Sequence, residues 1–213
     1  MPQLLDKSIE ILSVKHLRGP NMWTYHPVIE VWIDIGELED YPSNLIPGFY
    51  GRLVKALPSL VEHRCSYGET GGFLKRVEEG TWPAHIMEHL TLELQNLAGI
   101  PGGFGKARDG DRRGVYKVMV SAINEEVTLT ALKYARDLYL ALAQDNQDYI
   151  ALVKDIIEKL RDLGDDLLLG PSTACIVNAA EERGIPSIRL SEGNLVQLGY
   201  GAKQRRIWTA ETD

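Results

Sequence analysis

The segment VIEVWIDI, residues 28–35, carries the clearest secondary-structure signal of the sequence. Its apolar and polar residues alternate, which is typical of a β-strand with one buried face. Residues 9–16 predict a second strand, and a Gly-Pro pair within residues 17–21 predicts the turn between the two. We therefore expect the chain to begin with a pair of strands.

Four helices and a further strand are expected after this pair. The helices are expected at residues 47–57, 71–79, 81–98 and 125–143, and the strand at residues 115–123. Thr81 is the expected N-cap of the third helix and Gly99 its end, and Asn124 is the expected N-cap of the fourth. Strands followed by helices, a strand and a helix predict a layered α+β domain.

A polar stretch at residues 144–149 marks the expected domain boundary. We expect residues 1–146 to form the α+β domain and residues 147–213 to form a small α/β unit. The second unit is expected to contain helices at residues 150–163 and 171–183 and strands at residues 187–190 and 195–198. The Gly-rich residues 101–105 lack the spacing of a phosphate-binding loop, so a plain loop is expected there.

The 213-residue chain is acidic, with a formal net charge of −7. This balance argues against a general nucleic-acid binder, which would carry a basic face. Neither a signal-peptide core nor an apolar stretch of membrane-spanning length is recognisable in the sequence. The two cysteines lie far apart and suggest no disulfide framework, so a reducing, cytoplasmic setting is expected.

The sharpest chemical signal is HIMEH at residues 85–89, an H-x-x-E-H pattern. On a helix, His85 and His89 lie about 40° apart around the axis and one turn apart, so both imidazoles can reach one metal ion. Glu88 lies about 60° from His85 on the side away from His89, where it could act as a base toward a water molecule. The pattern therefore favours a zinc site on this helix.

A catalytic zinc site usually has three protein ligands, so a third is needed. Cysteine is not expected to supply it. Glu93 is about 12 Å along the helix axis from His85, which is awkward for one ion on a straight helix. Glu125 or Glu126, at the start of the next long helix, is preferred because a carboxylate from a second helix can complete the site without bending the first.

The alternative is that the motif histidines are ordinary helix-surface groups bridged to Glu88 or Glu93. Chance gives this pattern in roughly one such sequence in a hundred. His63 has no partner at ligand spacing in the sequence and is expected to be structural.

Stretches spread over nearly the whole chain resemble the N-terminal region of cyanophycin synthetases, in the order of that family. They are LRGPN (17–21), PGFY (47–50), LPSL (57–60), GGFL (71–74), EGTW (79–82), the helix at 85–99, INEE (123–126), LGPST (169–173), VQLGYG (196–201) and QRRI (204–207). Residues 144–166 match that family in helical character alone.

This resemblance implies that the full-length protein is an ATP-dependent ligase that polymerises aspartate and arginine into the storage polymer cyanophycin. ATP and Mg²⁺ would be used by an ATP-grasp domain and a Mur-ligase-like domain after this region, with residues 170–206 leading into the first. The present chain is therefore not expected to make polymer alone. Its expected partners are the polymer and the remaining synthetase domains, within a homo-oligomer.

The resemblance also implies a role for the N-terminal domain itself. In this family the domain is understood to hold the growing polymer. Some members carry a site similar to that of the pitrilysin and insulin-degrading-enzyme metallopeptidases, which trims polymer into primers. The implied roles are zinc ligation by His85 and His89, proton transfer by Glu88, and Glu125 or Glu126 as the third ligand.

Four arginines are candidate contacts to the carboxylate groups of the polymer. They are Arg18, Arg108, Arg112 and Arg113. Each taken alone is more simply a solvated surface charge. Three functions stay open: a slow zinc hydrolase, a polymer-binding domain without chemistry, and a scaffold for the synthetase oligomer. Metal content separates the first from the others, and polymer affinity separates the second from the third.

Overall fold

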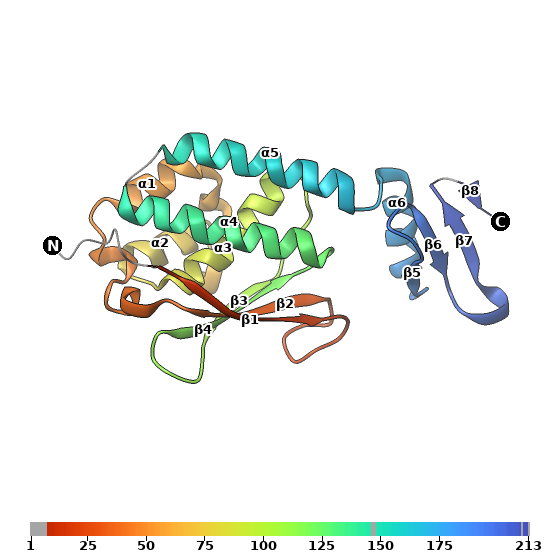
Figure 1. Ribbon diagram of the computed structural model, residues 1–213, viewed down its shortest axis with the longest axis horizontal. Coiled ribbons are helices and arrows are strands. Elements are labelled where there is room, and N and C mark those ends of the chain that lie inside the picture. The colour runs from red at the N-terminus through yellow and green to blue at the C-terminus, as the bar shows by residue number, and fades with distance from the viewer. Residues whose placement is uncertain (1–7, 146–147, 210, 213) are drawn as a thin grey trace. The chain divides into compact units, whose positions relative to one another are not determined.

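The predicted strand pair is part of a four-stranded antiparallel sheet (Figure 1). The structure is a computed structural model that describes residues 8–145, 148–209 and 211–212. It divides into one unit of Met1–Arg161 and another of Asp162–Asp213. The sheet belongs to the first unit and has the order β1-β2-β4-β3, with β1 at Glu10–Leu17, β2 at Val28–Asp34, β3 at Gly105–Asp109 and β4 at Val115–Ser121.

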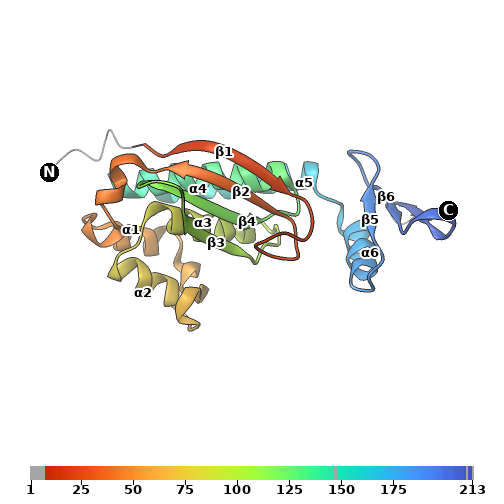
Figure 2. The ribbon, with the colours of Figure 1, turned by 90° about the horizontal axis from the view of Figure 1, so that it is seen from below.

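Two long helices, α3 (Pro83–Leu97) and α4 (Glu125–Gln144), cover one face of this sheet, as the view from below shows (Figure 2). The alternation in β2 explains the arrangement, because Ile29, Val31 and Ile33 are fully buried. The fold is therefore a layered α+β structure, as the order of the elements predicted.

Shorter elements surround this core. They are the helices α1 (Phe49–Ala56) and α2 (Gly72–Glu79), the 3₁₀ segments η2 (Gly36–Asp40), η3 (Ser43–Leu45), η4 (Pro58–Glu62) and η5 (Cys65–Tyr67), and the helix α5 (Tyr149–Leu167).

Residues 105–109 form the edge strand β3, where sequence analysis expected a loop ending at residue 105 and no strand. The expected N-cap at Thr81 is also wrong: Trp82 precedes the helix, and the Thr81 hydroxyl contacts His85 instead.

The predicted cap of α4 is confirmed. The Asn124 side-chain oxygen accepts hydrogen bonds from the backbone N–H groups of Glu126 and Val127. We expect Asn124→Ala to lower the free energy of unfolding by about 1 kcal/mol, because two N–H groups lose their acceptor. Asn124→Ser, which keeps a capping oxygen, is the matched control. Urea unfolding checks this, and equal stability of both variants would contradict the capping role.

The second unit packs a helix on its own small sheet. It contains α6 (Pro171–Glu181), β5 (Ser187–Arg189), β6 (Leu195–Leu198), η6 (Gly201–Lys203), β7 (Arg205–Trp208) and β8 (Glu211–Thr212). The strands pair antiparallel in chain order, and Val177, Val196 and Ile207 form its core. Sequence analysis predicted α6, β5 and β6 but not β7 or β8.

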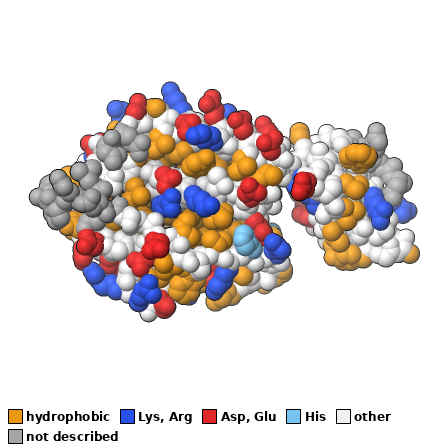
Figure 3. Space-filling view, in the orientation of Figure 1, with side chains coloured by type: hydrophobic (Ala, Val, Ile, Leu, Met, Phe, Trp, Pro, Cys, Tyr) orange, Lys and Arg blue, Asp and Glu red, His pale blue; other side chains and the backbone are white. Residues whose placement is uncertain are grey.

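The domain boundary expected after residue 146 falls on residues 146 and 147, which lie outside the described part, so it stays a prediction. Within the described residues, no helix combines the length and apolar composition that a membrane span requires. On the face of the first unit drawn in Figure 3, acidic and basic side chains are interspersed.

Candidate metal centre

Helix α3 carries the whole H-x-x-E-H motif in the interior of the first unit. Pro83 occupies its first turn, where a missing N–H costs nothing, and the helix ends before Gly99, whose φ is 82°. His89 and Glu88 are each only 6% exposed. The motif therefore does not lie on a freely solvated helix surface, which argues against the alternative interpretation of ordinary surface groups.

Cys65, at the start of η5, joins the two motif histidines. Its Sγ atom lies 3.2 Å from Nε2 of His85, and the donor atoms of Cys65, His85 and His89 all lie within 4.8 Å of one another. The backbone of Cys65 has a φ of 51°, a conformation that non-glycine residues adopt infrequently and mostly under local constraint. One thiol and two imidazoles on one centre form a donor set typical of zinc.

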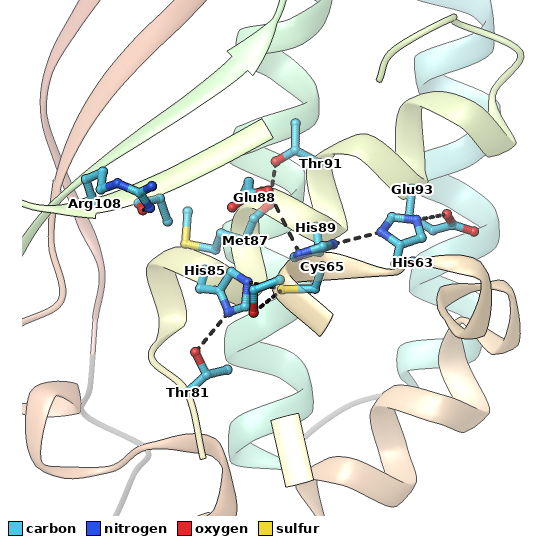
Figure 4. A network of polar contacts seen from close by, with 12 residues as sticks. His63, Cys65, Thr81, His85, Met87, Glu88, His89, Thr91, Glu93 and Arg108 are labelled. Carbon is cyan, nitrogen blue, oxygen red and sulfur yellow. Dashed lines mark hydrogen bonds and ion pairs between the residues drawn. The ribbon is translucent and has the colours of Figure 1, made fainter. Parts of the chain in front are cut away.

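Each motif histidine also has a partner for its other ring nitrogen (Figure 4). Nδ1 of His85 lies 2.9 Å from the Thr81 hydroxyl. Nδ1 of His89 lies 2.8 Å from Nδ1 of His63, and Nε2 of His63 lies 2.7 Å from Glu93. In metal sites, ligating histidines characteristically bond an outer partner through the second nitrogen.

The electrostatics of the cluster favour neutral imidazoles. Burial, together with the charge of Arg76, lowers the pKa of His85 to about 4. Burial likewise holds the pKa of His89 far below its usual value, with His85 and His63 acting in the same direction. Neutral imidazole has the lone pair that a metal ion needs.

Glu88 faces the same centre from α3. Its carboxylate lies 3.9 Å from Nε2 of His89. Burial raises the pKa of Glu88 to about 7, against the opposing effects of the Arg108 charge and of the backbone N–H of Ala107. A carboxyl group with a pKa near neutrality is suited to accept and release a proton.

A cavity of about 730 Å³ opens onto this cluster. Its lining includes the side chains of Cys65, His85, Glu88 and His89, four cationic residues (Arg64, Arg76, Lys106 and Arg108), Asp109, and the aromatic rings of Trp82 and Tyr116. Charges of both signs therefore border the cavity beside the thiol and the two imidazoles.

The carboxylates expected to complete the zinc site lie elsewhere. Glu125 pairs with Arg18, at 2.8 Å from Nη2, and with His16 at 3.0 Å. Neither Glu125 nor Glu126 is among the residues that line the cavity. Both carboxylates lie away from the imidazoles because of the direction in which α4 runs relative to α3.

The start of α4 packs against the far end of α3. Gln95 donates a hydrogen bond to the Thr128 hydroxyl there, about 15 Å along the axis from His85. The structure therefore brings neither Glu125 nor Glu126 to the imidazoles, and it brings the thiol of Cys65, a residue type that sequence analysis did not expect. Glu93, the other candidate, contacts His63 and Ser59.

Of the four candidate arginines, only Arg108 borders the cavity. Arg112 lies 3.2 Å from Asp34, Arg113 pairs with Asp40, and Arg18 pairs with Glu125. Sequence analysis missed Cys65, His63 and Thr81 as members of the cluster. One local signal was present: a histidine and a cysteine two residues apart in the segment HRC at residues 63–65.

Comparison with known proteins assigns the chain to a family. A family model described as the cyanophycin synthase-like N-terminal domain matches residues 30–144. The chain is 45% identical to the cyanophycin synthetase of Trichormus variabilis over 207 residues, which cover 96% of this chain and 23% of the relative. It is 47% identical to the cyanophycin synthetase of a Synechocystis species over 203 residues, 93% of this chain and 23% of the relative. The chain thus spans less than a quarter of the length of these relatives.

Proposed function

This chain belongs to the family of cyanophycin synthase-like N-terminal domains, and we propose from this premise that it is a domain of a cyanophycin synthetase that binds the polymer and hydrolyses it at a zinc site. The ligase chemistry, with its ATP and Mg²⁺, would belong to other domains of the same protein. The observation that carries the hydrolytic part is the convergence of Cys65, His85 and His89 beside Glu88. Cleavage would shorten long chains into primers for new synthesis.

The donor set fits zinc in number and in chemistry. Three protein ligands leave a fourth position open, as in catalytic zinc sites. In the described structure, Nε2 of His85 points to the thiol and Nδ1 of His89 is engaged by His63. Nε2 of His89 is thus the nitrogen left for the ion. Cys65, His85 and His89 would hold the zinc, in place of the carboxylate that sequence analysis expected.

Zinc, when bound, supplies Lewis acidity for amide hydrolysis. Glu88 supplies the proton transfers: its carboxylate accepts a proton from the attacking water and delivers it to the nitrogen of the leaving amine. The Ala107 N–H and the Arg108 guanidinium hold the carboxylate from the side of β3. Because the pKa of Glu88 is about 7, both the accepting and the donating form are accessible at neutral pH.

The cavity suits a substrate that carries both charges. Cyanophycin presents guanidinium and carboxylate groups. Arg76 and Arg108 can bind carboxylates in the two-point manner of guanidinium groups, while Asp109 can bind a guanidinium. The indole of Trp82, which is 37% exposed on the cavity, offers a face on which a guanidinium can stack.

Gly105 on β3 provides a test of the position of Glu88. A Cβ atom at Gly105 would stand 2.6 Å from Oε1 and 2.8 Å from Cγ of Glu88. We expect Gly105→Ala to displace the carboxylate and to lower the cleavage rate about a hundredfold, which is the effect of a displacement of about 1 Å at a reacting group. Zinc content should stay unchanged, because no donor atom is touched.

Gly103→Ala is the matched control for this variant, since no heavy atom lies within 4 Å of the added Cβ. Release of soluble oligomers from cyanophycin measures the rate, and metal analysis measures the zinc. A Gly105→Ala variant that cleaves at the wild-type rate would contradict the assignment of Glu88.

Polymer binding without chemistry is the second candidate function, favoured by the charges of both signs around the cavity. Sedimentation of the chain with insoluble cyanophycin tests it. A chain that binds polymer and never cleaves it, with any metal, would leave this second function in place of the first. A chain that does neither would leave the scaffold role.

A further inference from the structure

A line of hydrogen bonds leads away from the metal centre into the protein interior. It runs from His89 to His63 and from His63 to Glu93, whose other carboxylate oxygen accepts a hydrogen bond from Ser59 in η4 (Figure 4 shows the two histidines and Glu93). The side chains of His63 and Glu93 are 13% and 6% exposed. His63, Glu93 and Ser59 do not belong to the donor set, and hydrolysis as proposed above does not use them.

We propose that Glu93 and His63 are positioning residues that fix His89 in the tautomer with hydrogen on Nδ1, so that Nε2 is presented to the zinc ion. This inference rests on the proposed zinc site and adds to it the residues that determine its affinity. Sequence analysis had expected His63 to be structural and had considered Glu93 as a direct zinc ligand in an awkward position.

The tautomer follows from counting donors and acceptors along the line. The Glu93 carboxylate only accepts, so it takes hydrogen from the Ser59 hydroxyl and from Nε2 of His63. Of the two directions open to the bond between the two histidines, the one in which Nδ1–H of His89 donates to a bare Nδ1 of His63 completes the line toward Glu93 and leaves the lone pair of His89 on Nε2. Nε2 is also the nitrogen of His89 that lies 3.9 Å from the Glu88 carboxylate.

The same elements fix the plane of the ring. Phe73 of α2 stacks on His89 with ring centroids 4.0 Å apart and an angle of 24° between the planes. His63 contacts the same ring through Nδ1, with ring centroids 5.1 Å apart. Stacking limits the tilt of the imidazole, and the His63 contact limits its rotation about the side-chain bonds.

A comparison within the site supports the outer-shell role. Thr81 contacts Nδ1 of His85 just as His63 contacts Nδ1 of His89. Both candidate ligands thus have their Nδ1 engaged by an outer partner, and only the His89 partner is itself held by a carboxylate. Outer partners of this kind typically contribute 10- to 100-fold to metal affinity.

Titration of the metal-free chain with Co²⁺ tests this proposal. Cobalt bound by a thiolate gives a charge-transfer absorption band, which reports the site directly. We expect His63→Ala to raise the Co²⁺ concentration at half-saturation 10- to 100-fold, with the band still formed at saturation. Competition with a chromophoric chelator should give the same ratio for Zn²⁺.

Two replacements of Glu93 keep the test decisive if His63→Ala does not fold. Glu93→Gln preserves volume and one accepting oxygen, whereas Glu93→Ala removes the partner of His63. We expect affinity to fall in the order wild type, Glu93→Gln, Glu93→Ala. His26→Ala, which removes an exposed histidine outside the cluster, is the control and should bind metal as the wild type does.

The thermal unfolding midpoint of each metal-free variant separates positioning from general stability. Variants that lose thermal stability but keep the wild-type metal affinity would overturn the positioning role while leaving the zinc site in place. A wild-type chain that never forms the cobalt band would instead contradict the zinc site itself, and the inference with it.

Discussion

Replacing Glu88 by glutamine is expected to lower cyanophycin cleavage by about 10²- to 10⁴-fold, the usual contribution of a general acid–base group. The amide keeps the volume of the side chain and its place beside β3, but it cannot take a proton from water. The zinc content should remain at the wild-type level, because Glu88 is not one of the three donors. Chromatography of the soluble products and metal analysis of the same sample give both quantities.

Glu126→Gln is the matched control for this experiment. Glu126 was a candidate ligand from the sequence, but it is exposed at the start of α4 and does not line the cavity. The control should cleave at the wild-type rate. If Glu88→Gln retained near wild-type cleavage with zinc bound, Glu88 would not be the base.

The second large effect is expected from Cys65→Ser. The affinity of the chain for zinc should fall by roughly a hundredfold or more, because one of three donors is replaced by a hydroxyl that keeps its proton. A four-ligand zinc site has a binding free energy of about 10–16 kcal/mol, and this magnitude follows if that energy is shared among its ligands. Cleavage at limiting zinc should fall with the affinity.

Cys175→Ser provides the control, since Cys175 is exposed in the second unit. Its zinc affinity should equal that of the wild type. Competition with a chromophoric chelator measures both variants. An unchanged affinity in Cys65→Ser would remove the thiol from the donor set and return the third position to a carboxylate.

The first part of the site was accessible from the sequence because it is local. His85, Glu88 and His89 lie within five residues of one helix, so helical geometry alone brings them to one side. The C-terminal end of that helix was equally readable, from the glycine that follows it, whereas its N-cap was assigned one residue too early. The family assignment predicted from the scattered motifs is confirmed by the comparisons.

The third proposed donor could not be found by local rules. Cys65 lies 20 residues before His85, on a 3₁₀ segment that reaches α3 only through tertiary packing. The preference for Glu125 or Glu126 assumed that the next long helix starts beside the motif, whereas it starts at the opposite end of α3. Spacing along the chain does not determine which end of a neighbouring helix meets a site.

Strand β3 was missed for a related reason. Its five residues, GKARD, show little apolar alternation, and pairing with β4 at the sheet edge makes them a strand. This edge strand supplies Gly105, Ala107 and Arg108, three of the groups around Glu88. The sequence therefore predicted the carboxylate proposed to react but not the environment that sets its position and its pKa.

The most direct test of the central claim is cleavage of purified cyanophycin by the wild-type chain before and after removal of its metal. The account predicts release of soluble aspartate–arginine oligomers by the zinc-loaded chain, loss of this release after chelation, and recovery when one equivalent of Zn²⁺ is returned. No release by the zinc-loaded chain, or a release that chelation does not change, would contradict a zinc-dependent hydrolase at Cys65, His85 and His89.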